Sequence, residues 1–276
     1  MLKKCSRRIL LVVLALSLLL LTGCVARPMT VPLVLAQTRA ALNRQNGVTA
    51  CVLLEGKGEV SYSGMDFSLP LKIKMDTEMT FDPRVIHMKG TAGSSVLGVD
   101  LDLPVEYYIS STPEDFTLCS RVEESAWYKT VFAKENEELQ TLPTLNAGTL
   151  TEAALYENTT LCEGKECRRI DLTLNADQIK ELLGDAAKLD AVSEGMNDDL
   201  RLRASLYLDK ETKLPVKLSA SAENTVHLME YALRDVKLEI VFSDWGTPGE
   251  ITIPEEALSA PEQAMPPQSV IGGILP

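Results

Sequence analysis

The stretch FSLPLKIKMDTEMTF, residues 67–81, decides the fold class because apolar and polar residues alternate along nearly its whole length. Its odd-numbered positions are mostly apolar, and its even-numbered positions are polar apart from Pro70. Successive side chains of a strand point to opposite faces of a sheet. The pattern therefore predicts a long strand with one apolar face and one wet face. Residues 97–109 repeat the pattern, with Asp100, Asp102 and Glu106 on the wet side.

Other segments predict more strands and a few helices. Helices are expected over 30–46 and 150–156, and from Asn175 onward, where Gln178 stands in the capping-box position and the apolar stripe is Ile179, Leu182, Leu183, Ala186 and Leu189. Strands are expected at 84–89, 116–122, 127–132, 200–208, 214–222, 236–242 and 251–254, with a hairpin over 160–174. Pro70 and Pro104 each mark an edge, a bulge or a bend.

These elements predict an α+β fold built on one large, curved antiparallel sheet. Long strands that are wet on one side are typical of antiparallel sheets. Two amphipathic helices must bury their apolar stripes, and the apolar sheet face is the available partner.

The N-terminal residues predict export. A basic segment, residues 1–8, precedes an apolar run over 9–21, which is short for the roughly 30 Å core of a membrane. The run ends in Leu21-Thr22-Gly23-Cys24, which resembles the lipobox of bacterial lipoproteins. The resemblance implies cleavage between Gly23 and Cys24 and a diacylglyceryl group on the Cys24 thiol. The alternative is an ordinary signal peptide in which Cys24 is incidental.

This N-terminus sets the expected organisation of the chain. Residues 1–23 are the signal peptide, 24–29 a tether, 30–258 the folded domain and 259–276 a disordered, Pro-rich tail. Loss of the signal would remove four basic side chains and change the net charge from −12 to −16. So acidic a protein is not expected to bind nucleic acid, or to adhere to anionic lipid by electrostatic attraction. We therefore expect a monomer held at the outer face of the cell membrane by its lipid.

The cysteines leave some pairings open. Cys162 and Cys167 flank a Gly-bearing turn, so a disulfide across the hairpin is reasonable outside the cytoplasm. Cys51 and Cys119 either pair with each other or stay as buried thiols. No metal site is expected, because no second Cys or His pair complements the spacing.

No motif indicates catalysis or a cofactor. The histidines are His87 and His227, and no Gly-x-Ser-x-Gly, Walker, Rossmann or calcium-loop pattern is present. We therefore predict no enzymatic activity and name no catalytic residue. An enzyme would become plausible only if either histidine lay beside a carboxylate in a cleft.

Several motifs resemble those of LolA/LppX-like lipoproteins of Gram-positive bacteria. They are Glu106-Tyr107-Tyr108-Ile109 with Trp127-Tyr128-Lys129, the hairpin LYLDKETKLPVK over 206–217, and the closing segments 242–245 and 251–257. The resemblance covers most of residues 30–258. It implies a half-barrel, in which helices cover the concave face of a curved sheet and leave an apolar cavity. Several members of that superfamily carry or sense lipids and lipoproteins.

The predicted cavity is the one group of residues in the sequence that indicates a function. Its candidate lining is Phe67, Leu69, Leu71, Ile73, Met75, Leu101, Leu103 and Val105. Two helices are few for so large a face, so the uncovered part is predicted to bind a lipophilic molecule. The alternatives are a filled core beneath the helices, or an interaction or sensor module with a protein partner and no ligand.

Overall fold

The computed structural model describes residues 29–62, 65–96, 99–112, 114–133, 150, 152–183, 197–228, 231–246 and 248–262. The chain divides into two compact units, Met1–Thr30 and Val31–Pro276, and the second carries every described helix and strand. Cys24 and the predicted signal peptide lie outside the described residues.

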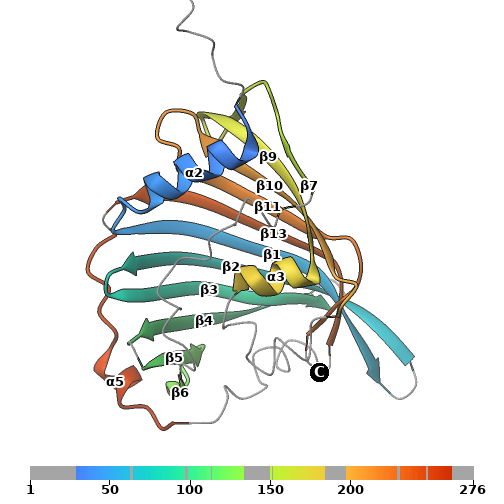
Figure 1. Ribbon diagram of the computed structural model, residues 1–276. Helices are drawn as coiled ribbons and strands as arrows, with labels where there is room; N and C mark the ends of the chain where they lie inside the picture. Colours follow the sequence, from blue (N-terminus) through green and yellow to red (C-terminus); the bar gives the residue numbers. More distant parts are fainter. Residues whose placement is uncertain are drawn as a thin grey trace, which may run out of the picture. The chain divides into compact units, whose positions relative to one another are not determined.

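The described part of the second unit forms one antiparallel sheet of 13 strands (Figure 1). Its main path runs β6-β5-β4-β3-β2-β1-β13-β11-β10-β9-β7, with β12 paired to β13 and β8 to β9. Because different strands occupy the two ends, the sheet is open. The strands are β1 (Gly47–Tyr62), β2 (Met65–Phe81), β3 (Arg84–Val96), β4 (Val99–Ser111), β5 (Asp115–Val122), β6 (Tyr128–Ala133), β7 (Glu152–Leu155), β8 (Thr160–Cys162), β9 (Lys165–Asn175), β10 (Arg201–Asp209), β11 (Pro215–Ala222), β12 (Val226–Leu228) and β13 (Tyr231–Trp245).

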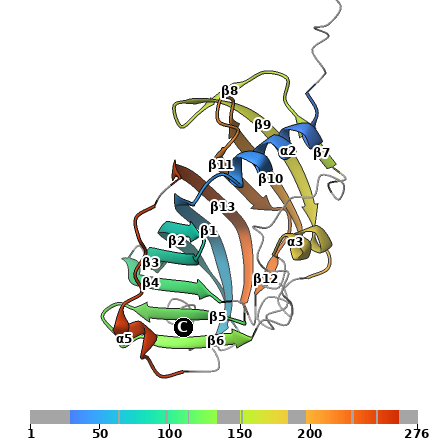
Figure 2. The same ribbon diagram turned by 60° about the vertical axis from the view of Figure 1, so that its left-hand side comes forward.

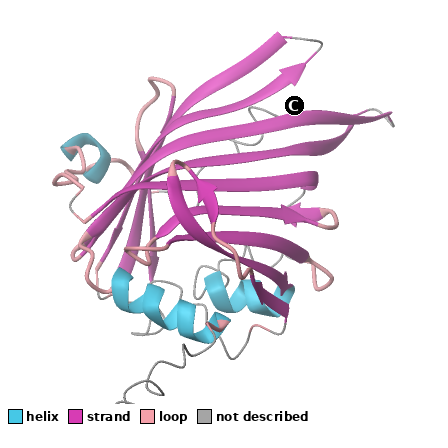
Figure 3. Cartoon of the chain, turned by 90° about the horizontal axis from the view of Figure 1, so that it is seen from above, coloured by secondary structure: helices cyan, strands magenta, loops and turns pink. Residues whose placement is uncertain are grey.

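Two helices lie on the concave side of the curved sheet, α2 (Val31–Leu42) and α3 (Ala176–Leu183) (Figure 2). The short α5 (Glu255–Leu258) lies apart from them (Figure 3). In α2 the buried residues Val34, Leu35 and Thr38 recur at helical spacing. The half-barrel that the sequence motifs predicted is confirmed.

The capping box of α3 is confirmed as well. The backbone N–H of Gln178 donates to Asn175 Oδ1 at 3.0 Å, and the backbone N–H of Asn175 donates to Gln178 Oε1 at 2.9 Å. These reciprocal bonds satisfy two N–H groups and fix where β9 ends and the helix begins. Ile179 is buried, as its stripe predicts, while the expected continuation over 184–196 lies outside the described residues.

Register joins both halves of the chain into one apolar face, because directly opposed residues of an antiparallel pair share a face. Ile73 on β2 opposes Leu54 on β1, which in turn opposes Leu238 on β13. The row continues through Ala220, Ala204 and Leu172 on β11, β10 and β9. We call this concave side the apolar face and the opposite side the polar face.

Pro70 and Pro104 each lie next to the point where pairing with one neighbouring strand begins. Pairing of β2 with β3 starts at Leu71, next to Pro70, and pairing of β4 with β5 starts at Val105, next to Pro104. Each proline is thus at a local edge, as predicted, and removes no hydrogen bond from a two-sided ladder.

Three sequence-based assignments are wrong. The expected helix at 150–156 is instead the strand β7, which pairs with β9 from Glu152 to Leu155. A segment this short is stabilised more by hydrogen bonds to an available sheet edge than by forming an isolated helical turn. Residues 251–254 form no strand, because Ile251 and Ile253 pack their side chains on a buried cluster of the polar face without joining a ladder.

The predicted disordered tail is also wrong at its start. Ala260 is buried, and the backbone N–H of Lys129 on β6 donates to the carbonyl of Pro261 at 3.4 Å. Residues 259–262 are therefore held on the sheet by α5 and β6, and the rest of the expected tail, 263–276, lies outside the described residues.

Candidate functional site

The predicted cavity residues all belong to strands of the apolar face, but they differ in burial. Leu71, Met75 and Val105 form a buried cluster with Ala92 and Leu233. Ile73 and Leu103 pack against that cluster, and Leu69 is half-buried. Part of the predicted lining is therefore filled core, which was the alternative interpretation.

The other end of the same strands is open to solvent. Phe67 is 44% exposed and Leu101 is 49% exposed, near the ends where β2 and β4 begin. Exposed apolar side chains that continue a buried apolar face, rather than lying singly on the surface, form a candidate binding surface. Helix α2 packs mainly on β7 and α3 on β9, at the far half of the sheet. The described helices thus leave the β2–β4 end of the apolar face without a comparable cover.

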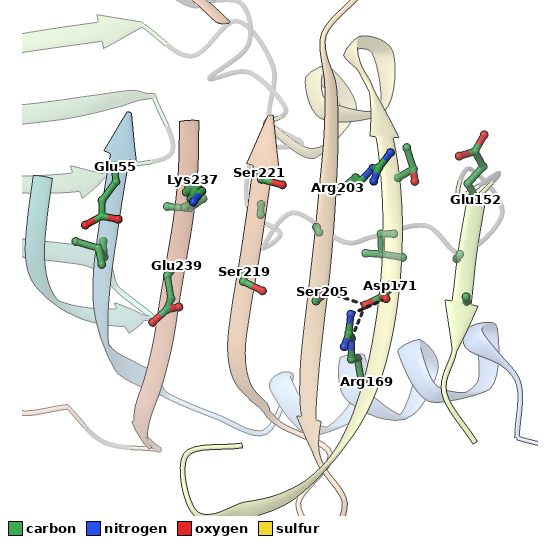
Figure 4. A pocket seen from close by; sticks show the side chains of 18 residues that line it. Glu55, Glu152, Arg169, Asp171, Arg203, Ser205, Ser219, Ser221, Lys237 and Glu239 are labelled. Carbon is green, nitrogen blue, oxygen red and sulfur yellow. Dashed lines mark hydrogen bonds and ion pairs between the residues drawn. The ribbon is translucent and has the colours of Figure 1, made fainter. Parts of the chain in front are cut away.

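Two hollows in the described part of the chain lie elsewhere. The larger, about 780 Å³, is lined from β1, β7, β9, β10, β11 and β13 (Figure 4). None of the predicted cavity residues lines either hollow. The lipophilic cavity assigned to these residues therefore stays a prediction.

A buried polar cluster that the sequence did not predict surrounds Glu106. Glu106 was expected on the wet face but is only 8% exposed. Its Oε1 lies 2.9 Å from His87 Nε2, and its Oε2 accepts from Arg121 Nε at 2.9 Å and Nη2 at 2.5 Å. Burial raises the pKa of Glu106, but the bonds to His87 and Arg121 outweigh it and leave the pKa below its usual value. The carboxylate is therefore held ionised.

Aromatic rings enclose this cluster. The ring of His87 stacks on Tyr108 with centroids 4.4 Å apart, and the Arg121 guanidinium lies 4.7 Å above the ring of Trp127. Such contacts of a cation with a ring are stabilising, more so when water is excluded. Tyr108 and Trp127 also pack against Ala257 and Ala260 of the C-terminal segment. The segment buries the cluster although it is remote in sequence.

The cluster brings His87 beside a carboxylate, yet it is built as a structural unit. Neither described hollow is lined by His87, Glu106 or Arg121. Burial raises the pKa of Tyr108, so its hydroxyl is a poor nucleophile. His227, on β12, is exposed. The geometry thus offers a satisfied buried ion pair rather than a catalytic relay in a cleft.

The structure excludes one cysteine pairing. Cys51 on β1 and Cys119 on β5 are separated by three intervening strands. Four strand spacings amount to about 19 Å, far beyond the reach of a disulfide. Cys119 is instead a buried thiol that donates to the carbonyl of Ala257 at 3.4 Å.

Cys162 and Cys167 are both buried free thiols in the structure. Register opposes Cys167 to Thr160, and Cys162 to Lys165, so the two are diagonal neighbours rather than direct partners. Their side chains interact, and burial together with Cys162 raises the pKa of Cys167 to about 11. A thiol with so high a pKa reacts slowly as a nucleophile.

Outside the cytoplasm, where oxidation is favoured, we still predict that these two cysteines pair, because their side chains interact directly. Alkylation of the unfolded, unreduced protein followed by mass spectrometry should label Cys51 and Cys119 but not Cys162 and Cys167. Label on all four before reduction would show that the hairpin carries free thiols. The same labelling after reduction is the control.

Among the described residues no group of three or more His, Cys, Asp or Glu side chains is placed to hold a metal ion. Within the same residues no helix combines the length and the apolar character needed to cross a membrane.

Comparison with known proteins gives distant structural likeness. No protein-family model and no curated protein matches the chain. The crystal structure of lipoprotein LppX from Mycobacterium tuberculosis is 15% identical, with a TM-score of 0.46, and the match covers 81% of this chain and 100% of that one. LprF from Mycobacterium bovis is 14% identical, with a TM-score of 0.43, over 81% and 95% of the two chains. A LolA superfamily protein from Nitrosomonas europaea is 10% identical, with a TM-score of 0.20, over 81% and 96%.

Proposed function

We propose that this chain is a non-enzymatic lipoprotein, anchored outside the cytoplasm by a lipid on Cys24, that binds a lipophilic molecule against its apolar face. The observation that carries the proposal is the exposure of Phe67 and Leu101 at one end of that face. Both side chains continue the row of apolar residues whose middle is the buried cluster of Leu71, Met75 and Val105. A lipophilic molecule that covered them would extend this core.

The energetics favour burial over polar recognition. At about 25 cal/mol per Å², covering about 300 Å² of apolar surface contributes about 7 kcal/mol before the entropy of binding is subtracted. That is enough for a measurable affinity without a specific hydrogen bond. The anchor places such a surface near the membrane, where lipophilic molecules are found.

Titration of the protein with a fluorescent fatty acid tests the proposal. We expect Phe67→Ser and Leu101→Ser each to weaken binding about 5- to 10-fold, because each removes most of a large side chain from the contact area. Leu161→Ser is the matched control, since Leu161 on β8 is 77% exposed and far along the chain from these strands. Equal affinity of all four proteins would contradict the assignment of the site.

A further inference from the structure

The polar face carries a groove that the proposed function does not use. We define the polar groove as the hollow of about 780 Å³ lined by Leu53, Glu55, Glu152, Ala153, Ala154, Arg169, Asp171, Leu172, Thr173, Arg203, Ala204, Ser205, Ser219, Ala220, Ser221, Lys237, Leu238 and Glu239. A smaller hollow of about 380 Å³ shares Glu55, Ser221 and Lys237 with it. The groove crosses six adjacent strands, which corresponds to a length of about 24 Å.

Register arranges its polar side chains in two rows across the strands (Figure 4). One row reads Glu55, Lys237, Ser221, Arg203, Thr173 and Glu152. The other reads Glu239, Ser219, Ser205 and Asp171. Charged groups and hydroxyls are therefore mixed along the floor, with Glu55, Arg203 and Glu239 paired to residues outside the lining and small serines at the centre.

One end of the groove is rigidly organised. Arg169 donates from Nε and Nη2 to the two carboxylate oxygens of Asp171 at 2.7 and 2.8 Å, and the Ser205 hydroxyl donates to the same carboxylate at 2.7 Å. The Arg169 guanidinium lies 4.8 Å from the ring of Tyr156 and 5.8 Å from that of Tyr207. The exposed ring of Tyr156 thus stands beside a fixed set of polar groups.

In the middle of the groove, several polar side chains have fewer interactions within the protein. Within the described part of the chain, no hydrogen bond or ion pair engages the side chains of Ser219, Ser221, Thr173 or Lys237. Half-buried hydroxyls and an ammonium group in a hollow are available to a ligand that brings its own polar groups. Each hydrogen bond of this kind contributes modestly, so a ligand must make several of them.

The charges of the lining define the chemical class of ligand. Four carboxylates, Glu55, Glu152, Asp171 and Glu239, face three cations, Arg169, Arg203 and Lys237. The near balance gives little attraction to an anion such as phosphate, and the described carboxylates form no metal-binding group. Five of the six strands that line the groove are paired along both sides, so only β7, at the end of the sheet, offers an edge to a peptide strand.

From this geometry we propose that the polar groove is a binding site for a neutral oligosaccharide. Such a chain offers many hydroxyls that both donate and accept, which suits a groove whose floor mixes donors, acceptors and hydroxyls. Tyr156 adjoins the Arg169 end of the groove, with the Arg169 guanidinium over its ring, and its 48% exposure leaves ring surface on which a sugar can lie. The site is on the opposite side of the sheet from the apolar face and does not depend on the proposed lipophilic ligand.

Calorimetric titration of the full chain with maltotetraose, cellotetraose and chitotetraose tests the proposal. At least one of the three should bind. Ser221→Val and Lys237→Gln should each weaken it about 5-fold, because the first removes a hydroxyl from the floor and the second replaces an ammonium group by a shorter, uncharged amide. Lys237 is exposed, so its variant tests the site even where Ser221→Val does not fold.

Two controls locate the binding. Lys74→Gln makes the matched change on an exposed lysine of β2 that does not line the groove, and it should leave binding unchanged. Phe67→Ser, on the apolar face, should also leave it unchanged, which separates this site from the lipophilic one. Failure of all three oligosaccharides to bind would overturn the proposal. So would affinities that neither groove variant alters, or binding of inorganic phosphate with the same sensitivity to Lys237→Gln.

Discussion

Replacing Cys24 with Ser should move the protein from the membrane fraction of cells to the soluble fraction. Each buried CH₂ of an acyl chain contributes about 0.8 kcal/mol to membrane attachment, so loss of the acylated thiol removes the whole anchor. The acidic chain has no compensating attraction to anionic lipid. Fractionation with detection of the protein by antibody gives the distribution directly.

The control for this experiment is Cys5→Ser. Cys5 lies within residues 1–23, the predicted signal peptide, so this change should leave the protein in the membrane fraction. The circular dichroism spectrum of the Cys24→Ser protein should match that of the wild type, because the anchor lies outside the sheet. A Cys24→Ser protein that sedimented with membranes would contradict the assignment of the anchor.

Replacing Glu106 with Gln should lower the free energy of unfolding by about 2 kcal/mol, because it leaves His87 and Arg121 without their shared carboxylate. Glutamine keeps the size of the side chain, so the loss reports charge and hydrogen bonding rather than a cavity. Urea denaturation of both proteins at about pH 7 measures the difference.

The contribution of Glu106 to the free energy of unfolding should depend on pH in a defined direction. The folded-state pKa of Glu106 is lowered, so its contribution is present above the ordinary carboxylate pKa of about 4.3 and is lost as pH falls through the folded value. The difference between wild type and Glu106→Gln should therefore shrink in acid. Glu78→Gln, the same change at an exposed position of β2, should alter stability by less than about 0.5 kcal/mol. A difference that stayed constant into acid would contradict the ionised cluster.

The strands with regular alternation were predictable from local sequence, and β2 is the clearest case. Its odd residues face the apolar side and its even residues, from Ser68 to Glu78, are exposed. Strand β1 lacks such a pattern because Ala50–Leu54 is apolar at both parities and glycines follow. It lies at the centre of the sheet between β2 and β13, where tertiary pairing overrides local preference.

The polar sites were not predictable for a different reason. Glu106 reads as a wet-face residue, and its burial depends on Ala257 and Ala260, far away in the sequence. The polar groove takes two to four residues from each of six strands, and only the register places Ser221 between Lys237 and Arg203. No local spacing carries that information. The apolar face was largely predictable because β2, β4 and β10 repeat the same alternation.

The most direct measurement for the proposed function is native mass spectrometry of the Cys24→Ser protein, purified without detergent from the soluble fraction of cells. We predict a bound species whose added mass disappears after extraction with organic solvent and which the Phe67→Ser variant carries at lower occupancy. A protein that appears at its bare mass in every preparation, or that instead retains a protein partner at Phe67 and Leu101, would contradict a lipophilic ligand on the apolar face.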